Sequence, residues 1–199
     1  DAEAARETRA AEASAHRAHA LLGRLYLRRG REDDARPVLM QLVAAYNDRS
    51  IGNDDAAGLS YVAMATAMLE HAHDANDAFT ASARADATRV ETQLEWAELF
   101  LSHHDAGHAE ECVRDALAVN PRSARAQALA ARIVLEQTLD FEAARRAIER
   151  ALEVSPSLVA AHATLAGMAL RDVDIVTADR HLDDALAIDP TDLEALSLR

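Results

Sequence analysis

Apolar residues recur at helical spacing in residues 159–190, and they divide into two stripes. Asp174 interrupts the pattern between the stripes, and Pro190 ends the second one. The segment therefore predicts two antiparallel helices that approach closely at Ala166 and Ala178, where the side chains are small. The members of the two stripes are Leu165, Ala166, Ala169 and Leu170, then Ala178, Leu182, Ala185 and Leu186.

The same two-stripe pattern recurs along the chain about every 34 residues. A single pair of such helices leaves one apolar face uncovered, so each pair needs a neighbour stacked beside it. The recurrence predicts an all-α solenoid of stacked antiparallel helix pairs. The five copies span residues 16–49, 59–89, 90–123, 124–158 and 159–192.

The order of residues within a copy resembles the tetratricopeptide repeat. In the last copy the columns of that repeat hold His162, Leu165, Ala166, Ala169, Ala178, Leu182 and Pro190. This copy departs from the pattern at His162 and Ala169, where a bulky and an aromatic residue are usual. The resemblance covers about nine tenths of the chain and implies a right-handed superhelix with a concave groove that binds peptides or proteins.

Four parts of the chain depart from regular repetition. Residues 1–15 have high helix propensity but no large apolar side chain, so we expect a helical extension or a linker remnant. Residues 47–58 are rich in turn formers and predict an inserted loop. The copy at 59–89 is degenerate because Thr66 and Ser82 occupy apolar columns. Residues 193–199 resemble the start of a further repeat or a capping helix, and we expect the chain to be part of a longer protein.

Composition excludes some classes of function. The net charge is −13, which disfavours a phosphate backbone as ligand, so we expect no nucleic-acid partner. No apolar run is long enough to cross a membrane, which predicts a soluble segment on the cytoplasmic or periplasmic side of a cell. Cys112 is the only cysteine, so it has no internal disulfide partner. Every basic residue is arginine, which indicates a GC-rich and therefore bacterial genome.

The sequence offers little support for catalysis, cofactors or metal. No phosphate-binding loop, zinc-protease helix or nucleophile motif is present, so we expect a protein without enzymatic activity or cofactor. The segment at 102–112 carries His103, His104, His108 and Cys112. The repeat register predicts a turn at 105–107, which separates His103 and His104 from His108 and Cys112. We therefore interpret the segment as an inter-helix turn capped by Asp105 rather than as a metal site.

The resemblance also places residues in the concave groove, on the first helix of each repeat. These positions predict an arginine-rich N-terminal end, an acidic band and a second basic band. They are Arg17, Ala20, Arg24, Leu27 and Arg28; Ser60, Ala63, Ala67, Glu70 and His71; Glu91, Leu94, Glu98 and Leu101; Arg125, Ala128, Arg132 and Leu135; Ala160, Ala163, Gly167 and Leu170.

Two interpretations of the groove charges follow. Glu91 with Arg125, and Glu98 with Arg132, occupy matching columns of adjacent repeats and can pair with each other. The arginines of the N-terminal end have no acidic match in the next repeat, so we expect them to be free to bind an acidic peptide segment or a terminal carboxylate.

The sequence therefore favours a protein-interaction scaffold that binds a peptide or partner protein in its groove. One alternative is a non-catalytic regulatory or substrate-recruiting arm of a larger enzyme. Another is self-association through an end repeat or the groove.

Overall fold

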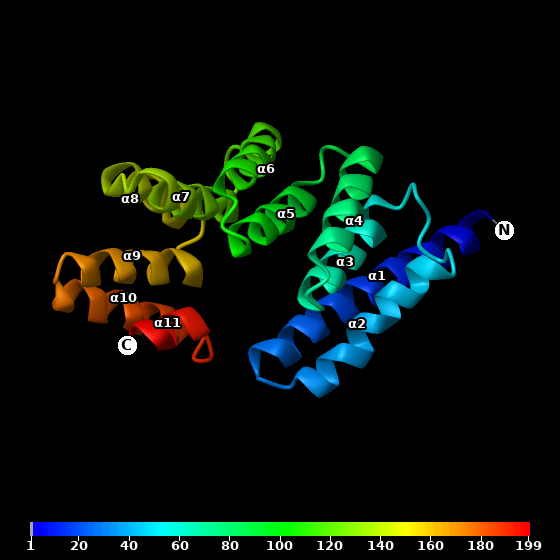
Figure 1. The fold of residues 1–199 in the computed structure, drawn as a ribbon, viewed down its shortest axis with the longest axis horizontal. Coiled ribbons are helices and arrows are strands. Elements are labelled where there is room, and N and C mark those ends of the chain that lie inside the picture. The colour runs from blue at the N-terminus through cyan, green and yellow to red at the C-terminus, as the bar shows by residue number, and fades with distance from the viewer. Residues whose placement is uncertain (1) are drawn as a thin grey trace. The chain divides into compact units, whose positions relative to one another are not determined.

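The computed structural model describes the backbone of residues 2–199 and the side chains of residues 11–199, and all its regular elements in this range are helices (Figure 1). Consecutive helices form antiparallel pairs, as the sequence pattern predicts. The helices are α1 (Ala2–Arg28), α2 (Glu32–Asn47), α3 (Ala56–Met68), α4 (Ala72–Ala85), α5 (Val90–Ser102), α6 (Ala106–Val119), α7 (Ala124–Thr138), α8 (Phe141–Val154), α9 (Val159–Arg171), α10 (Ile175–Ile188) and α11 (Leu193–Leu198).

The chain forms two compact units, Asp1–Glu95 and Trp96–Arg199, and the boundary falls inside α5. In the first unit α1 packs on α2, α3 packs on α4, and α3 also contacts both α1 and α2. In the second unit the pairs are α7 with α8 and α9 with α10, while α6 packs on α7 and α8 packs on α9. The short α11 contacts both α9 and α10, as the first helix of a further pair would. Within each unit, every helix pair thus covers a face of its neighbour.

Each helix pair reverses direction at a residue with left-handed backbone. At four of these turns, the residue that follows the left-handed one donates its N–H to a carbonyl five residues earlier, at 2.9 Å. Asp105, Asp140 and Asp174 then cap the next helix, because each side chain accepts a backbone N–H three residues on. The left-handed residues of these turns, with φ between 55° and 66°, are Gly30, Glu70, His104, Leu139 and Val173.

Alanine makes up much of the core, as the scarcity of aromatic residues predicts. In the second unit one buried cluster joins α7, α8 and α9, and its largest members are Ile148, Leu165 and Met168. The remaining buried members are Ala128, Ala131, Ala144, Ala147, Ala151 and Ala161. Ala166 and Ala178 are fully buried, in agreement with the close approach predicted for α9 and α10. Small side chains let helix axes approach closely, so burial here depends on short interhelical distances.

The irregular parts of the sequence fold with small differences from expectation. Residues 2–28 form one continuous helix, so the backbone of the N-terminal extension belongs to α1. The connection between α2 and α3 spans residues 48–55, and α3 begins at Ala56, three residues before the predicted start of its repeat. Ile51 is buried inside this connection, so one apolar side chain anchors the loop to the first unit.

The degenerate copy has its polar side chains satisfied. Thr66 Oγ1 donates to the Val62 carbonyl at 2.9 Å, within its own helix. Ser82 Oγ on α4 lies 2.7 Å from the Ala56 carbonyl and 2.9 Å from Thr92 Oγ1. A carbonyl only accepts, so Ser82 donates to Ala56 and receives the hydroxyl hydrogen of Thr92. These two bonds connect α4 to α3 and to α5.

Candidate functional site

Several predicted groove positions are part of the core. Ala20, Leu94 and Leu101 are buried, with exposed fractions of 0%, 4% and 6%. Ser60, Ala63 and Ala128 are buried in the same way. Leu94 and Leu101 therefore leave almost no surface for a ligand, contrary to the apolar contacts predicted for them, because their side chains pack inward from α5.

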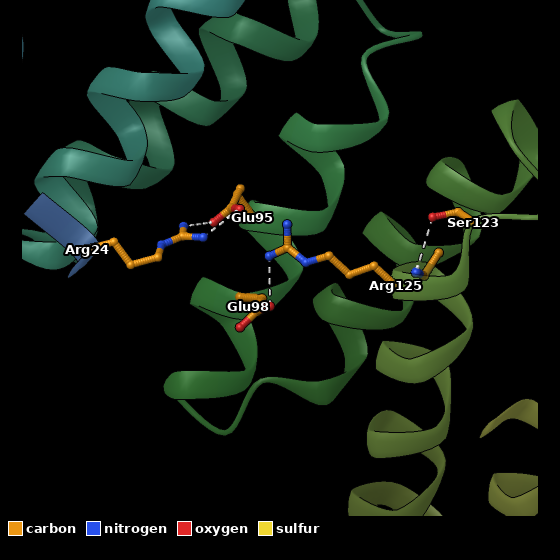
Figure 2. A network of polar contacts seen from close by, with 6 residues as sticks. Arg24, Glu95, Glu98, Ser123 and Arg125 are labelled. Carbon is orange, nitrogen blue, oxygen red and sulfur yellow. Dashed lines mark hydrogen bonds and ion pairs between the residues drawn. The ribbon is translucent and has the colours of Figure 1, made fainter. Parts of the chain in front are cut away.

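The prediction that the N-terminal arginines are free is wrong for Arg24. Its guanidinium forms a bidentate ion pair with Glu95 on α5, as Figure 2 shows, with Nη1 3.3 Å from Oε1 and Nη2 in contact with Oε2. The Glu95 side chain is 11% exposed, so this carboxylate is largely withdrawn from solvent. An acidic match was expected only in the next repeat, at 59–89, whereas Glu95 belongs to the repeat after it, at 90–123.

The other predicted residues of the first unit are scattered. Arg28 is exposed but already interacts with another part of the protein, so it is not free either. Arg17 is exposed on α1, and Ala67 is half-buried on α3. His71 was placed on the first helix of its repeat, and this is wrong: α3 ends at Met68, and His71 precedes the first residue of α4.

Leu27 and Glu70 instead line a small cleft of about 190 Å³ at the inter-helix turns of the first unit. Its walls come from α1, α2 and α3. It is therefore built partly from a second helix, unlike the groove that the resemblance implies.

The predicted pairing of groove charges is also wrong in its partners. Arg125 Nη2 on α7 donates to Glu98 Oε1 on α5 at 2.8 Å, so Glu98 pairs with Arg125 rather than with Arg132 (Figure 2). Glu91 is exposed at the start of α5. The arginine reaches along the helix to a carboxylate two turns from its matching column. Both side chains are about a third exposed or more, so this pair contributes little to stability.

The second unit contains a cleft of about 400 Å³ that is lined mainly by the first helices of successive pairs, α7, α9 and α11, with Phe141 at the start of α8. Four predicted groove residues meet here, namely Arg132, Leu135, Ala163 and Gly167. Their small or apolar side chains, Arg132 excepted, give the cleft a mainly apolar floor. The sequence reasoning missed the other lining residues, which are Glu136, Phe141, Thr164, Met168, Glu194 and Leu198.

Three charged residues line this cleft, namely Arg132, Glu136 and Glu194. Burial raises the pKa of Glu194 on α11, and the positive charge of Arg132 acts in the opposite direction. Extending the 34-residue period by one step places Glu194 in the column of Ala160, so the sequence did contain a signal for it. Leu170 and Ala160, also predicted, lie on α9 outside the lining of the cleft.

Two histidines near the α5–α6 turn have acidic partners, His104 with Glu136 on α7 at 3.5 Å and His108 with Asp105. Asp105 caps α6 by accepting the His108 N–H, as predicted, and its Oδ2 lies 2.7 Å from His108 Nδ1. This contact raises the pKa of His108, so its ring is protonated more readily and is a poorer metal ligand. Cys112 is buried, and desolvation raises its pKa to about 12, which keeps the thiol protonated. The geometry agrees with the interpretation of this segment as a capped turn.

None of the described helices combines the length and apolar character needed to cross a bilayer.

Comparisons with known proteins identify the fold. No protein-family model and no curated protein sequence matches the chain. Solved structures do match. TTC0263, a tetratricopeptide-repeat protein of Thermus thermophilus, superposes with a TM-score of 0.69 at 18% identity, over 92% of this chain and 95% of that one. PilF of Pseudomonas aeruginosa gives a TM-score of 0.66 at 16% identity, over 93% and 81% of the two chains.

A third similar structure is YrrB, described as a tetratricopeptide-repeat protein with an unusual peptide-binding site. It has a TM-score of 0.54 at 14% identity, over 90% of this chain and 89% of that one. The chain therefore has the tetratricopeptide-repeat fold, which confirms the resemblance found in the sequence.

Proposed function

We propose that this chain is a protein-interaction scaffold that binds an apolar segment of a partner protein in the cleft between α7, α9 and α11. The observation that carries the proposal is the cleft itself, because nine of its ten lining residues lie on the first helices of successive pairs. Its volume of about 400 Å³ falls within the range of roughly 300–1,000 Å³ that is usual for ligand sites. A recruiting arm of a larger enzyme would use the same surface.

The lining of the cleft suggests the chemistry of the partner. Gly167 has no side chain, so a partner can approach the backbone of α9 closely at this position. Leu135 and Leu198 are half-buried and supply apolar contact area, while Ala163 and Met168 are buried beneath the floor of the cleft. Arg132 adds one basic group to the lining, and Glu136 and Glu194 add two acidic ones. We infer a partner segment with one or two large apolar side chains flanked by polar groups.

An acidic segment bound at the N-terminal end has weaker support. Arg24 is engaged by Glu95, and Arg28 also has a partner inside the protein. Breaking the Arg24–Glu95 pair would remove the arginine from a largely buried carboxylate, which is costly. We therefore propose the cleft, and not the arginines, as the principal contact with the partner.

The cleft proposal is tested by substituting Gly167. Peptides are selected from a random display library on the wild-type protein, and their affinities are measured by fluorescence polarisation. In Gly167→Leu the new side chain occupies the floor of the cleft, and we expect the selected peptides to bind about 10- to 200-fold more weakly, as for a methylene-scale misfit in an apolar pocket.

Gly167→Ala is the matched control. A Cβ at this position would lie 3.9 Å from Leu198 Cδ1, which is an ordinary van der Waals distance. Both substitutions remove the same helical glycine, so a loss of affinity in Gly167→Leu alone reports filling of the cleft. If every selected peptide binds Gly167→Leu as tightly as the wild type, the cleft is not the binding site. Arg17→Glu with Arg28→Glu is expected to leave these affinities unchanged.

A further inference from the structure

Two histidines and an aspartate meet between α9 and α10, outside the lining of the cleft. His162 lies on α9, and His181 and Asp184 lie three residues apart on one face of α10. Each residue offers one potential ligand atom, and these atoms all lie within 4.8 Å of one another. His162 is also the residue that departs from the bulky type usual in its repeat column.

The ring of His162 is held in a defined orientation. Its Nε2 lies 2.9 Å from the Pro156 carbonyl, which only accepts, so Nε2 carries the hydrogen. In the neutral ring the lone pair is then on Nδ1. That atom lies 3.5 Å from His181 Nδ1 and 3.8 Å from Asp184 Oδ2. A metal-binding histidine typically donates its other N–H to a carbonyl or carboxylate in this way.

Two of the three separations between ligand atoms are close to those around a small tetrahedral ion. Zinc binds histidine nitrogen and carboxylate oxygen at about 2.0–2.2 Å, which places neighbouring ligand atoms of a tetrahedron roughly 3.3–3.6 Å apart. The distances from His162 Nδ1 to its two neighbours differ from that range by at most a few tenths of an ångström. Small rotations of the half-exposed Asp184 side chain would close the remaining gap.

We propose that His162, His181 and Asp184 form a binding site for a divalent transition-metal ion, with Zn²⁺ as the best fit and water as the fourth ligand. The metal would connect the two helices of the last complete repeat. Imidazole and carboxylate are suitable ligands for zinc, and three protein ligands with one open position are a common arrangement. This proposal goes beyond the interaction function and does not depend on it.

Some neighbours of His181 favour metal binding, and others reduce the affinity for metal. Burial lowers its pKa, helped by the positive charges of Arg180 and Arg145 and by His162, while Asp184 opposes the shift. The neutral ring is the form that binds metal. Arg180 Nη2 lies 3.4 Å from His181 Nε2 and can only donate, so ligation through Nδ1 requires that contact to break. The two arginines therefore reduce the affinity of the site for a cation.

The experiment measures Zn²⁺ binding to the intact chain by isothermal titration calorimetry. We expect one zinc per chain in the wild type and a loss of affinity of at least about tenfold in Asp184→Asn and in His181→Gln. The two variants are chosen because Asp184 is half-exposed and His181 is less buried than His162. Asp184→Asn keeps the shape of the side chain, so its fold is expected to be intact by circular dichroism.

Matched controls separate this site from other histidines and acids. Asp183→Asn removes the neighbouring carboxylate, which pairs with Arg199, and His108→Gln removes a histidine from the α5–α6 turn. Both controls should bind zinc as the wild type does. The visible absorption of bound Co²⁺ should show tetrahedral ligation in the wild type and in both controls, and lose it in the site variants. Absence of zinc binding in the wild type, or equal binding in Asp184→Asn and His181→Gln, would overturn the proposal.

Discussion

Single polar residues in the core of the first unit are held by specific hydrogen bonds. Ser82 and Thr92 are both fully buried, and Ser82 connects α4 to the Ala56 carbonyl on α3 and to Thr92 on α5. A buried hydroxyl without a partner is destabilising, so each of these groups depends on the other. In the sequence, Ser82 is a polar residue in a column where an apolar one is expected. In the structure, its hydroxyl forms hydrogen bonds with two neighbouring helices.

Ser82→Ala should lower the free energy of unfolding by roughly 1–3 kcal/mol, because it leaves the Thr92 hydroxyl without its acceptor. Urea titration followed by circular dichroism measures the change. Thr92→Val provides the second half of a double-mutant cycle. The combined variant should lose less stability than the sum of the two single variants, since the second change removes the group that the first one left unpaired. Simple additivity would show that the bond contributes nothing specific.

At the scale of elements, the inter-helix turns share one geometry but not one residue type. Gly30 is the only glycine among the five left-handed positions of these turns, and the other four are Glu70, His104, Leu139 and Val173. Left-handed backbone costs a non-glycine residue roughly 1–2 kcal/mol, and a β-branched side chain is the least suited to it. Val173 is 77% exposed, so its side chain gains little packing in return.

Val173→Gly should therefore raise stability, by up to about 1 kcal/mol after the greater entropy of glycine in the unfolded chain is subtracted. Val176→Gly is the matched control, because Val176 is 82% exposed and lies in the first turn of α10. The same substitution there should lower stability by roughly 0.5–1 kcal/mol. Thermal melts of both variants should move in opposite directions. A lower melting temperature for Val173→Gly would contradict the account of strain at this turn.

At the scale of the whole molecule, the net charge of −13 produces the main long-range interaction, which is electrostatic repulsion. The chain has 34 acidic and 21 basic residues, and the excess negative charge repels itself in the folded state. Exposed ion pairs such as Arg31–Asp34 oppose this effect only weakly, since solvent screens the attraction between their charges. Net repulsion should therefore outweigh surface pairing.

Added NaCl should consequently raise the melting temperature between about 0.01 M and 0.15 M, where the Debye length falls from about 30 Å to about 8 Å. Differential scanning fluorimetry at constant pH measures the shift. A variant with the exposed residues Glu111, Asp115 and Asp179 changed to their amides loses three negative charges and should respond less to salt. A melting temperature that falls as salt is added would show that ion pairs, and not repulsion, dominate.

Much of the fold could be predicted because its determinants are local and repeated. The helix pairs follow from apolar periodicity, the turn at Asp105 from capping chemistry, and the close approach of α9 and α10 from the alanines at 166 and 178. Each signal lies within about 34 residues of its partner, so it can be recognised within a single copy and compared among copies. The apolar residues Leu135, Ala163 and Gly167 of the cleft were found through the same columns.

The long-range partners of individual side chains could not be predicted in this way. Arg24 pairs with Glu95 across 71 residues of sequence, and Arg125 pairs with Glu98 instead of the column match Glu91. A flexible arginine reaches several positions on a neighbouring helix, so its choice depends on helix position and rotamer rather than on repeat register.

The all-α architecture, the order of the helix pairs and the kinds of residue at their contacts follow from the sequence, because these depend on periodic burial and local capping. The packing of the helices sets which charged groups are engaged, which groove columns are buried, and that His162, His181 and Asp184 lie together. Those properties depend on distances between side chains of different helices, and such distances are fixed only when the helices pack.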